Sequence, residues 1–342
     1  MLLLGLMLAA AGVFGVRLPL LTVGPGPVID LATLVSVEAS DDGATHPTWL
    51  MTTIQARPAT AAAALWASLN PKLELVSERR LLPPGYDLAS YVELNRRLMH
   101  ESRIVATYVA LRWAGRPATI SGTGAEVVAV WPDSPAQMAG FQRGDVIRRC
   151  GRRPVRLAGD AHSPACAGRG RIEVEVWRDG RPHRLMVELP GPEAGEAAFG
   201  WLLATRELAG PATPAVEFRR DDLGGPSAGL AFALFLADRL TGLGVDPSWR
   251  IAATGTLSPD GTIQPVGGIA HKVRAVSAFG ADRLLVPMGN LDEARQVAGQ
   301  LTVWGVATFD EAVRRLTGNF RRRYNGSVRE GGGHAHRRGR NS

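Results

Sequence analysis

Residues 221–240 read DDLGGPSAGLAFALFLADRL and place Ser227 directly after a glycine-proline turn and before a strongly apolar helix. A hydroxyl at this position lies close to free backbone N–H groups and to the positive end of the helix dipole. Such surroundings favour a nucleophilic oxygen, and backbone donors such as those of Gly225 and Ala228 would stabilise the oxyanion of an acyl intermediate. The alternative is a serine that only caps the helix.

A second segment, residues 254–275, reads TGTLSPDGTIQPVGGIAHKVRA and contains Lys272. The pattern predicts a hairpin over 256–264, a helix that carries Lys272 and ends at Gly280, and a buried strand over 283–287. Only two of the chain's 39 basic residues are lysines, so a plain surface charge here would be expected to be arginine. A partly buried lysine near a helix N-terminus has a lowered pKa and can accept a serine's proton, which a guanidinium cannot.

Together the two segments closely resemble the proteolytic domain of Lon-type proteases over about residues 199–316. GGPSAG is similar to the family's nucleophile motif and PVGGIAHK to its lysine motif, in the right order and separation. The resemblance implies a serine endopeptidase acting on protein or peptide substrates, with Ser227 as nucleophile and Lys272 as general base. It also implies that Thr254 supports the lysine and that the chain self-associates into a homo-oligomer.

The sequence departs from the family at two places. Many Lon proteases carry an acidic residue where this chain has Gly224, which leaves open an inactive protease domain. The chain also contains no GxxxxGK[ST] motif, so we expect peptide hydrolysis that is independent of ATP in this chain. Neither a cofactor nor a metal is expected, because no Cys/His spacing suggests zinc.

Residues 127–147, VVAVWPDSPAQMAGFQRGDVI, resemble a bacterial PDZ domain, and the resemblance covers about residues 118–190. PDZ domains bind an extended peptide as an added strand, often with a loop of backbone N–H groups that holds the terminal carboxylate. That loop would contain Gly122 and Gly124. The alternative is a spacer between the N-terminal segment and the next domain.

Residues 1–16 carry no charge, and Leu18–Val23 continue mostly apolar after Arg17. The combined length suffices for a single membrane-spanning helix, which predicts a cell-membrane anchor. A cleaved signal peptide is the alternative. The order of anchor, PDZ and Lon-type domain resembles a bacterial subfamily whose catalytic body lies outside the cytoplasmic membrane.

Charge gives no sign of a nucleic-acid partner. The net charge is +7, and residues 319–342 hold seven arginines and one glutamate, so the rest of the chain is near +1. The tail has no apolar face and is expected to be disordered.

The sequence therefore predicts an α+β multidomain chain. It consists of an N-terminal membrane helix (1–23), a small α/β region (24–117), a PDZ-like β-rich domain (118–190), a Lon-type α+β proteolytic domain (199–318) and the basic tail (319–342). The alternative function is a membrane-tethered PDZ peptide-binding protein whose protease domain is inactive.

The two cysteines, Cys150 and Cys166, both fall in the PDZ-like segment. A disulfide between them would close a loop of ~15 residues, stabilise the fold by about 3 kcal/mol and suit an oxidising compartment. Two unrelated thiols too far apart to bond are the alternative.

Overall fold

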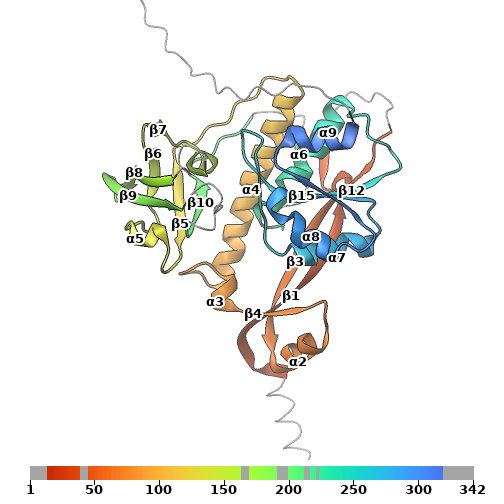
Figure 1. The fold of residues 1–342 in the computed structure, drawn as a ribbon, viewed down its shortest axis with the longest axis horizontal. Helices are drawn as coiled ribbons and strands as arrows, with labels where there is room; N and C mark the ends of the chain where they lie inside the picture. Colours follow the sequence, from red (N-terminus) through yellow and green to blue (C-terminus); the bar gives the residue numbers. More distant parts are fainter. Residues whose placement is uncertain are drawn as a thin grey trace, which may run out of the picture.

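The computed structural model describes residues 14–38, 45–162, 169–190, 199–211, 216–220 and 223–318. Within these ranges a mixed six-stranded sheet carries helices on both faces, and a second six-stranded sheet, antiparallel throughout, lies beside it (Figure 1). The long helix α4 (Leu88–Trp113) stands between the two sheets.

The main sheet combines strands from both ends of the chain in the order β16-β15-β12-β3-β1-β4. Strands β12, β15 and β16 pair in parallel, and β12 also pairs in parallel with β3, whereas β1 pairs antiparallel with β3 and β4. The strands are β1 (Arg17–Asp30), β3 (Thr48–Thr60), β4 (Glu74–Ser77), β12 (Arg250–Ala253), β15 (Arg283–Pro287) and β16 (Thr302–Val306).

Alternation along the strands sorts the core into two layers. In β3, Trp49 and Met51 pack against the face covered by α4, α6 (Gly229–Thr241) and α9 (Phe309–Thr317). Leu50 points to the other face, against α7 (Ile269–Phe279) and α8 (Leu291–Gln296). Successive side chains of a strand face opposite sides of the sheet, so central strands covered on both faces must be apolar throughout.

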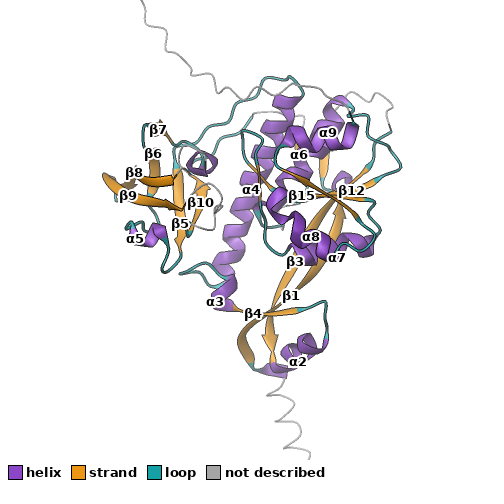
Figure 2. Cartoon of the chain, in the orientation of Figure 1, coloured by secondary structure: helices purple, strands orange, loops and turns teal. Residues whose placement is uncertain are grey.

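Shorter elements complete this unit (Figure 2). They are the helices α2 (Ala61–Leu69) and α3 (Glu78–Leu81), the 3-10 turns η1 (Leu31–Thr33), η5 (Pro226–Ala228) and η6 (Met288–Asn290), and the paired strands β2 (Val35–Val37) with β11 (Val216–Phe218) and β13 (Thr256–Leu257) with β14 (Ile263–Gln264).

The second sheet belongs to residues 121–209, which we call the β-rich unit. Its strands follow the order β10-β5-β6-β8-β9, with β7 added to β6, and every pairing is antiparallel. They are β5 (Ala125–Val130), β6 (Val146–Cys150), β7 (Arg153–Pro154), β8 (Arg169–Arg178), β9 (Arg181–Pro190) and β10 (Trp201–Thr205), joined by α5 (Pro135–Met138) and η2 (Ala158–His162). A tight turn at 178–181 joins β8 to β9, and Asp179 and Gly180 both have the positive φ that such hairpin turns favour.

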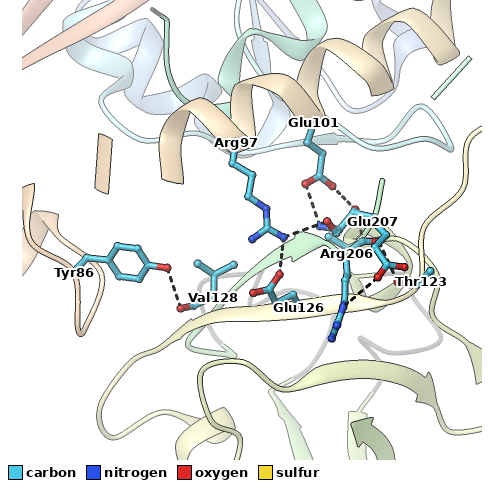
Figure 3. Close-up of polar contacts among 10 residues, drawn as sticks. Tyr86, Arg97, Glu101, Thr123, Glu126, Val128, Arg206 and Glu207 are labelled. Carbon is cyan, nitrogen blue, oxygen red and sulfur yellow. Dashed lines mark hydrogen bonds and ion pairs between the residues drawn. The ribbon is translucent and has the colours of Figure 1, made fainter. Parts of the chain in front are cut away.

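Helix α4 joins the β-rich unit to the main sheet. Arg97 of α4 lies 2.6 Å from Glu126 of β5, and the Tyr86 hydroxyl donates to the Val128 carbonyl over 3.4 Å (Figure 3). Apolar contacts between α4 and strands β5 and β10 add to these polar ones. The unit therefore rests on the same helix that packs on α6.

Two predicted domain limits differ from this arrangement. Residues 24–117 do not form a separate region, because β1, β3 and α4 complete the sheet and core that contain β12, β15 and α6. The predicted start of the last domain at 199 also assigns β10 to it, whereas β10 pairs with β5. The β-rich unit is thus inserted into one larger α/β unit.

The predicted membrane helix over 1–23 is wrong at its C-terminal end, because Arg17–Val23 belong to β1 and pair with β3 and β4. Residues 1–13 lie outside the described residues, as does the tail 319–342. No helix in the described ranges is both long and apolar enough to cross a membrane.

Cys150 ends β6 and is disulfide-bonded. Its predicted partner, Cys166, lies outside the described residues.

Candidate active site

Ser227 sits in the single turn η5 that leads into α6. Gly225 precedes this turn with φ 92°, a value that favours glycine, and Pro226 begins it. The serine is half-buried, whereas the next residue, Ala228, is buried. The turn therefore exposes one hydroxyl at the N-terminal end of a helix, as the sequence predicts.

Helix α4 fixes the turn from the side. The Gly225 N–H donates to the Asn95 carbonyl over 2.8 Å, and the Ser102 hydroxyl donates to the Pro226 carbonyl over 3.0 Å. Because its N–H is already bonded, Gly225 does not serve as the predicted oxyanion donor. No local pattern in α4 marks Asn95 or Ser102, so sequence reasoning gave neither residue a role.

The same contact accounts for the unusual Gly224. A Cβ atom on Gly224 would lie 2.9 Å from the Cβ of Asn95, closer than such atoms approach. The acidic residue of many Lon proteases therefore has no room here while Asn95 is present.

Lys272 lies in the first turns of α7, which begins after Gly268. Its side chain is only 2% exposed. Burial lowers the pKa of Lys272 to about 8, because an ammonium group loses its hydration in the core. A substantial fraction of this lysine is consequently a neutral amine slightly above neutral pH.

Thr254 connects the lysine to the nucleophile turn. Lys272 Nζ donates to Thr254 Oγ1 over 3.1 Å, and Thr254 Oγ1 donates to the Ser227 carbonyl over 3.1 Å. The Gly255 N–H donates to the same carbonyl over 2.8 Å. The structure thus links Ser227 of the first segment to Thr254 and Lys272 of the second, with Thr254 between the other two.

A cavity of about 120 Å³ lies beside this turn, between α4, the β-rich unit and β13. Pro226, Leu98 and Leu257 are among its lining residues, most of which are aliphatic. At its wall the Glu101 carboxylate accepts hydrogen bonds from the N–H and hydroxyl of Thr205 (Figure 3). The cavity therefore adjoins both the nucleophile turn and the contact between α4 and β10.

The predicted carboxylate loop around Gly122 and Gly124 is packed against its neighbours. The Gly124 N–H donates to the Arg156 carbonyl over 3.0 Å, and the Thr123 N–H donates to the Arg206 carbonyl over 2.9 Å. A Cβ atom on Gly122 would lie 2.5 Å from the Thr205 side chain. These N–H groups are not free to hold a peptide carboxylate.

Comparison with known proteins shows a similarity in the C-terminal part of the chain. Residues 221–316 match the family model of the Lon protease (S16) C-terminal proteolytic domain. This segment is similar to a Lon-type proteolytic domain. The matched segment contains Ser227, Thr254 and Lys272. Within the described ranges no group of three or more His, Cys, Asp or Glu side chains could hold a metal ion.

Three relatives illustrate the extent of the match. A Lon protease of Clostridium beijerinckii is 33% identical over 98 residues, 28% of this chain and 12% of the relative. An archaeal Lon protease of Archaeoglobus fulgidus is 32% identical over 92 residues, 26% of this chain and 14% of the relative. Lon protease 1 of Sorangium cellulosum is 38% identical over 95 residues, 27% of this chain and 12% of the relative. The similarity to each is thus confined to the Lon-type domain, a small part of the relative's length.

Proposed function

We propose that this chain is a serine endopeptidase in which Ser227 attacks a peptide carbonyl and Lys272 accepts the serine proton. The attack forms an acyl-enzyme ester, and the lysine ammonium then protonates the departing amine. A water molecule then attacks the ester and gives a proton to the lysine, which passes it to the Ser227 oxygen as the carboxylic acid product leaves. The observation that carries this proposal is the buried Lys272 hydrogen-bonded to Thr254, which in turn holds the Ser227 carbonyl.

The Thr254 hydroxyl supports the role of the lysine as a base. Its single proton goes to the Ser227 carbonyl, so its oxygen acts as an acceptor toward Lys272. A neutral amine that donates one N–H to Thr254 keeps its lone pair for another partner. In the proposal that partner is the Ser227 hydroxyl.

The oxyanion would be held by the N–H of Ala228 at the start of α6, with the helix dipole adding to its effect. The N–H of Gly225 is excluded from this role by its bond to Asn95.

We further propose that the β-rich unit is a PDZ-like module that binds protein substrates. We also propose that the apolar N-terminal residues tether the chain to a membrane, with its body outside the cytoplasm. The Ser134–Met138 cap and short helix, the five-strand antiparallel order and the disulfide at Cys150 are consistent with this. Strand β9 is the sheet edge away from α4, so strand addition by a peptide has an edge to use (Figure 1).

The test compares lysine variants at two positions. Lys272→Arg should lower kcat for a peptide substrate by ~10²–10⁴-fold, because the guanidinium cannot act as a base. Lys72→Arg is the matched control and should leave kcat unchanged. Ser227→Ala should abolish both hydrolysis and labelling by a serine-directed covalent probe. A wild-type chain that binds peptides but neither hydrolyses them nor takes the label would support the alternative, a tethered peptide-binding protein.

A further inference from the structure

Helix α2 presents an apolar face that nothing in the described chain covers. Leu65, Trp66 and Leu69 are 65%, 63% and 73% exposed, although they are large apolar side chains. Their spacing places them on one side of the helix, and the buried Ala67 faces the strands. Exposed clusters of this kind mark sites of contact with a partner or a membrane.

The first described residues lie at the same end of the molecule. Arg17 of β1 pairs with Thr60 of β3, and α2 starts at the next residue. Phe14 and Val16, which precede Arg17, are also exposed. Figure 1 shows α2 at the tip of the arm formed by β1, β3 and β4, away from the β-rich unit. The exposed apolar face of α2 and the apolar residues before β1 therefore lie at the same end of the main sheet.

The chain that enters this tip is itself apolar and uncharged over residues 1–16. The residues around it are basic: Arg17, Arg57 and Lys72 are all exposed. The nearby acid, Glu74, is turned to His271 of α7 at 3.5 Å. An apolar face with a tryptophan and a basic rim matches the boundary between acyl chains and anionic headgroups.

We propose that α2 lies in the surface of an anionic lipid bilayer, with Leu65, Trp66 and Leu69 inserted below the headgroups. The three basic residues contact lipid phosphates, and the arm sets the height of the catalytic site above the membrane. A second copy of the chain is a poorer occupant, because a nine-residue helix offers far fewer than the 20–30 residues a stable interface uses. The inference rests on the membrane tethering proposed above and is independent of the peptidase chemistry.

The experiment uses the full chain bound to vesicles of brominated phosphatidylcholine with phosphatidylglycerol, because bromine quenches only tryptophans that contact the acyl chains. The chain has eight tryptophans, so Trp66 would account for about an eighth of the emission if all emit equally. Bromine-dependent quenching should be seen in the wild type and be lost in Trp66→Phe. Trp177→Phe removes a tryptophan that is also exposed, on β8, and should leave the quenching unchanged.

The charge requirement is tested in the same assay. The double variant Arg57→Glu with Lys72→Glu should reduce the quenching several-fold, as should vesicles of phosphatidylcholine alone. Co-flotation of the protein with the same vesicles measures membrane tethering. Hydrolysis of a soluble peptide measures peptidase activity separately. Tethered and active protein whose quenching is unaffected by Trp66→Phe would overturn the proposal. A vesicle-bound chain that is not quenched and has twice the monomer mass would also overturn it, because a second copy would then cover the apolar face of α2. The same holds if residues 1–13 cover that face.

Discussion

Lys272 Nζ donates a hydrogen bond to Thr254 Oγ1 over 3.1 Å in a part of the core where both side chains are almost fully buried. The lysine comes from the first turns of α7, and the threonine follows strand β12. The lysine is thus held by a helix, and the threonine lies directly after a central strand, where its N–H donates to the Leu285 carbonyl of β15 over 3.0 Å. A base fixed in this way loses little freedom when substrate binds.

The first prediction concerns pH. If the neutral form of Lys272 is the base, kcat for a peptide substrate should rise with pH and level off above a midpoint near 8. Two pH units below that midpoint only ~1% of the lysine is neutral, so the rate should fall about a hundredfold. A pH-rate profile over pH 5.5–10 measures this directly. A profile that is flat between pH 6 and 8 would rule the mechanism out.

The second prediction concerns stability. Because burial lowers the pKa of Lys272, the folded chain binds fewer protons than the unfolded chain between pH 8 and the ordinary lysine value. Lys272 therefore lowers the free energy of unfolding at acidic and neutral pH, and this penalty disappears as pH rises through that window. Lys272→Met removes the cost of burying the ammonium group. At pH 7 its free energy of unfolding should exceed that of the wild type by on the order of 3 kcal/mol.

Urea titrations at pH 7 and pH 10 check this, since the advantage of Lys272→Met should shrink at the higher pH. Lys72→Met, at an exposed position, serves as control and should show no such pH-dependent gain. Equal stability of Lys272→Met and wild type at both pH values would contradict a buried, desolvated lysine.

The third prediction concerns Thr254. Thr254→Val deletes both of its side-chain hydrogen bonds at nearly constant shape and should lower kcat by about 10–10²-fold. Losing the acceptor should also move the midpoint of the pH-rate profile below 8, because a hydrogen bond to the ammonium favours the charged form. Thr254→Ser keeps the hydroxyl and should restore most of the rate and the midpoint. If valine and serine behave alike, Thr254 has no positioning role.

The fourth prediction concerns Gly224 and Asn95. Gly224→Ala should destabilise the fold by about 1–3 kcal/mol, because its Cβ would lie 2.9 Å from that of Asn95. Asn95→Gly removes the opposing Cβ and should cost about 1 kcal/mol by itself as a glycine within a helix. In a double-mutant cycle the combined variant should be less destabilised than the sum of the two. Additive effects would show that the two positions do not collide.

Local sequence patterns were sufficient for the elements that carry the candidate site residues. The glycine-proline turn before Ser227, the helix that ends at Gly280 and the strand over 283–287 all follow from periodicity and turn residues, and the structure confirms them. These features depend on neighbours in the chain, which is why a single sequence reveals them.

Features that depend on distant pairing were not predictable in this way. Strand β3 pairs with β12, about 200 residues later, and no local pattern indicates that partner. For the same reason, the sequence did not indicate that β10 belongs to the second sheet or that the Asn95 carbonyl accepts the Gly225 N–H. The misplaced end of the membrane helix has a different cause, because Leu18–Val23 are apolar in a helix and in a covered strand alike.

The insertion of the β-rich unit has a consequence for synthesis. During translation β1, β3 and α4 emerge long before their neighbours β12, β15 and β16, so the early chain exposes an unfinished sheet. Sheets closed by distant segments form slowly, and their open edges invite aggregation. Ser227 gains its contacts with Thr254 and, through it, with Lys272 only when β12 and α7 have been added. Under the proposed mechanism, a chain that ends before α7 lacks Lys272 and should therefore hydrolyse no peptide.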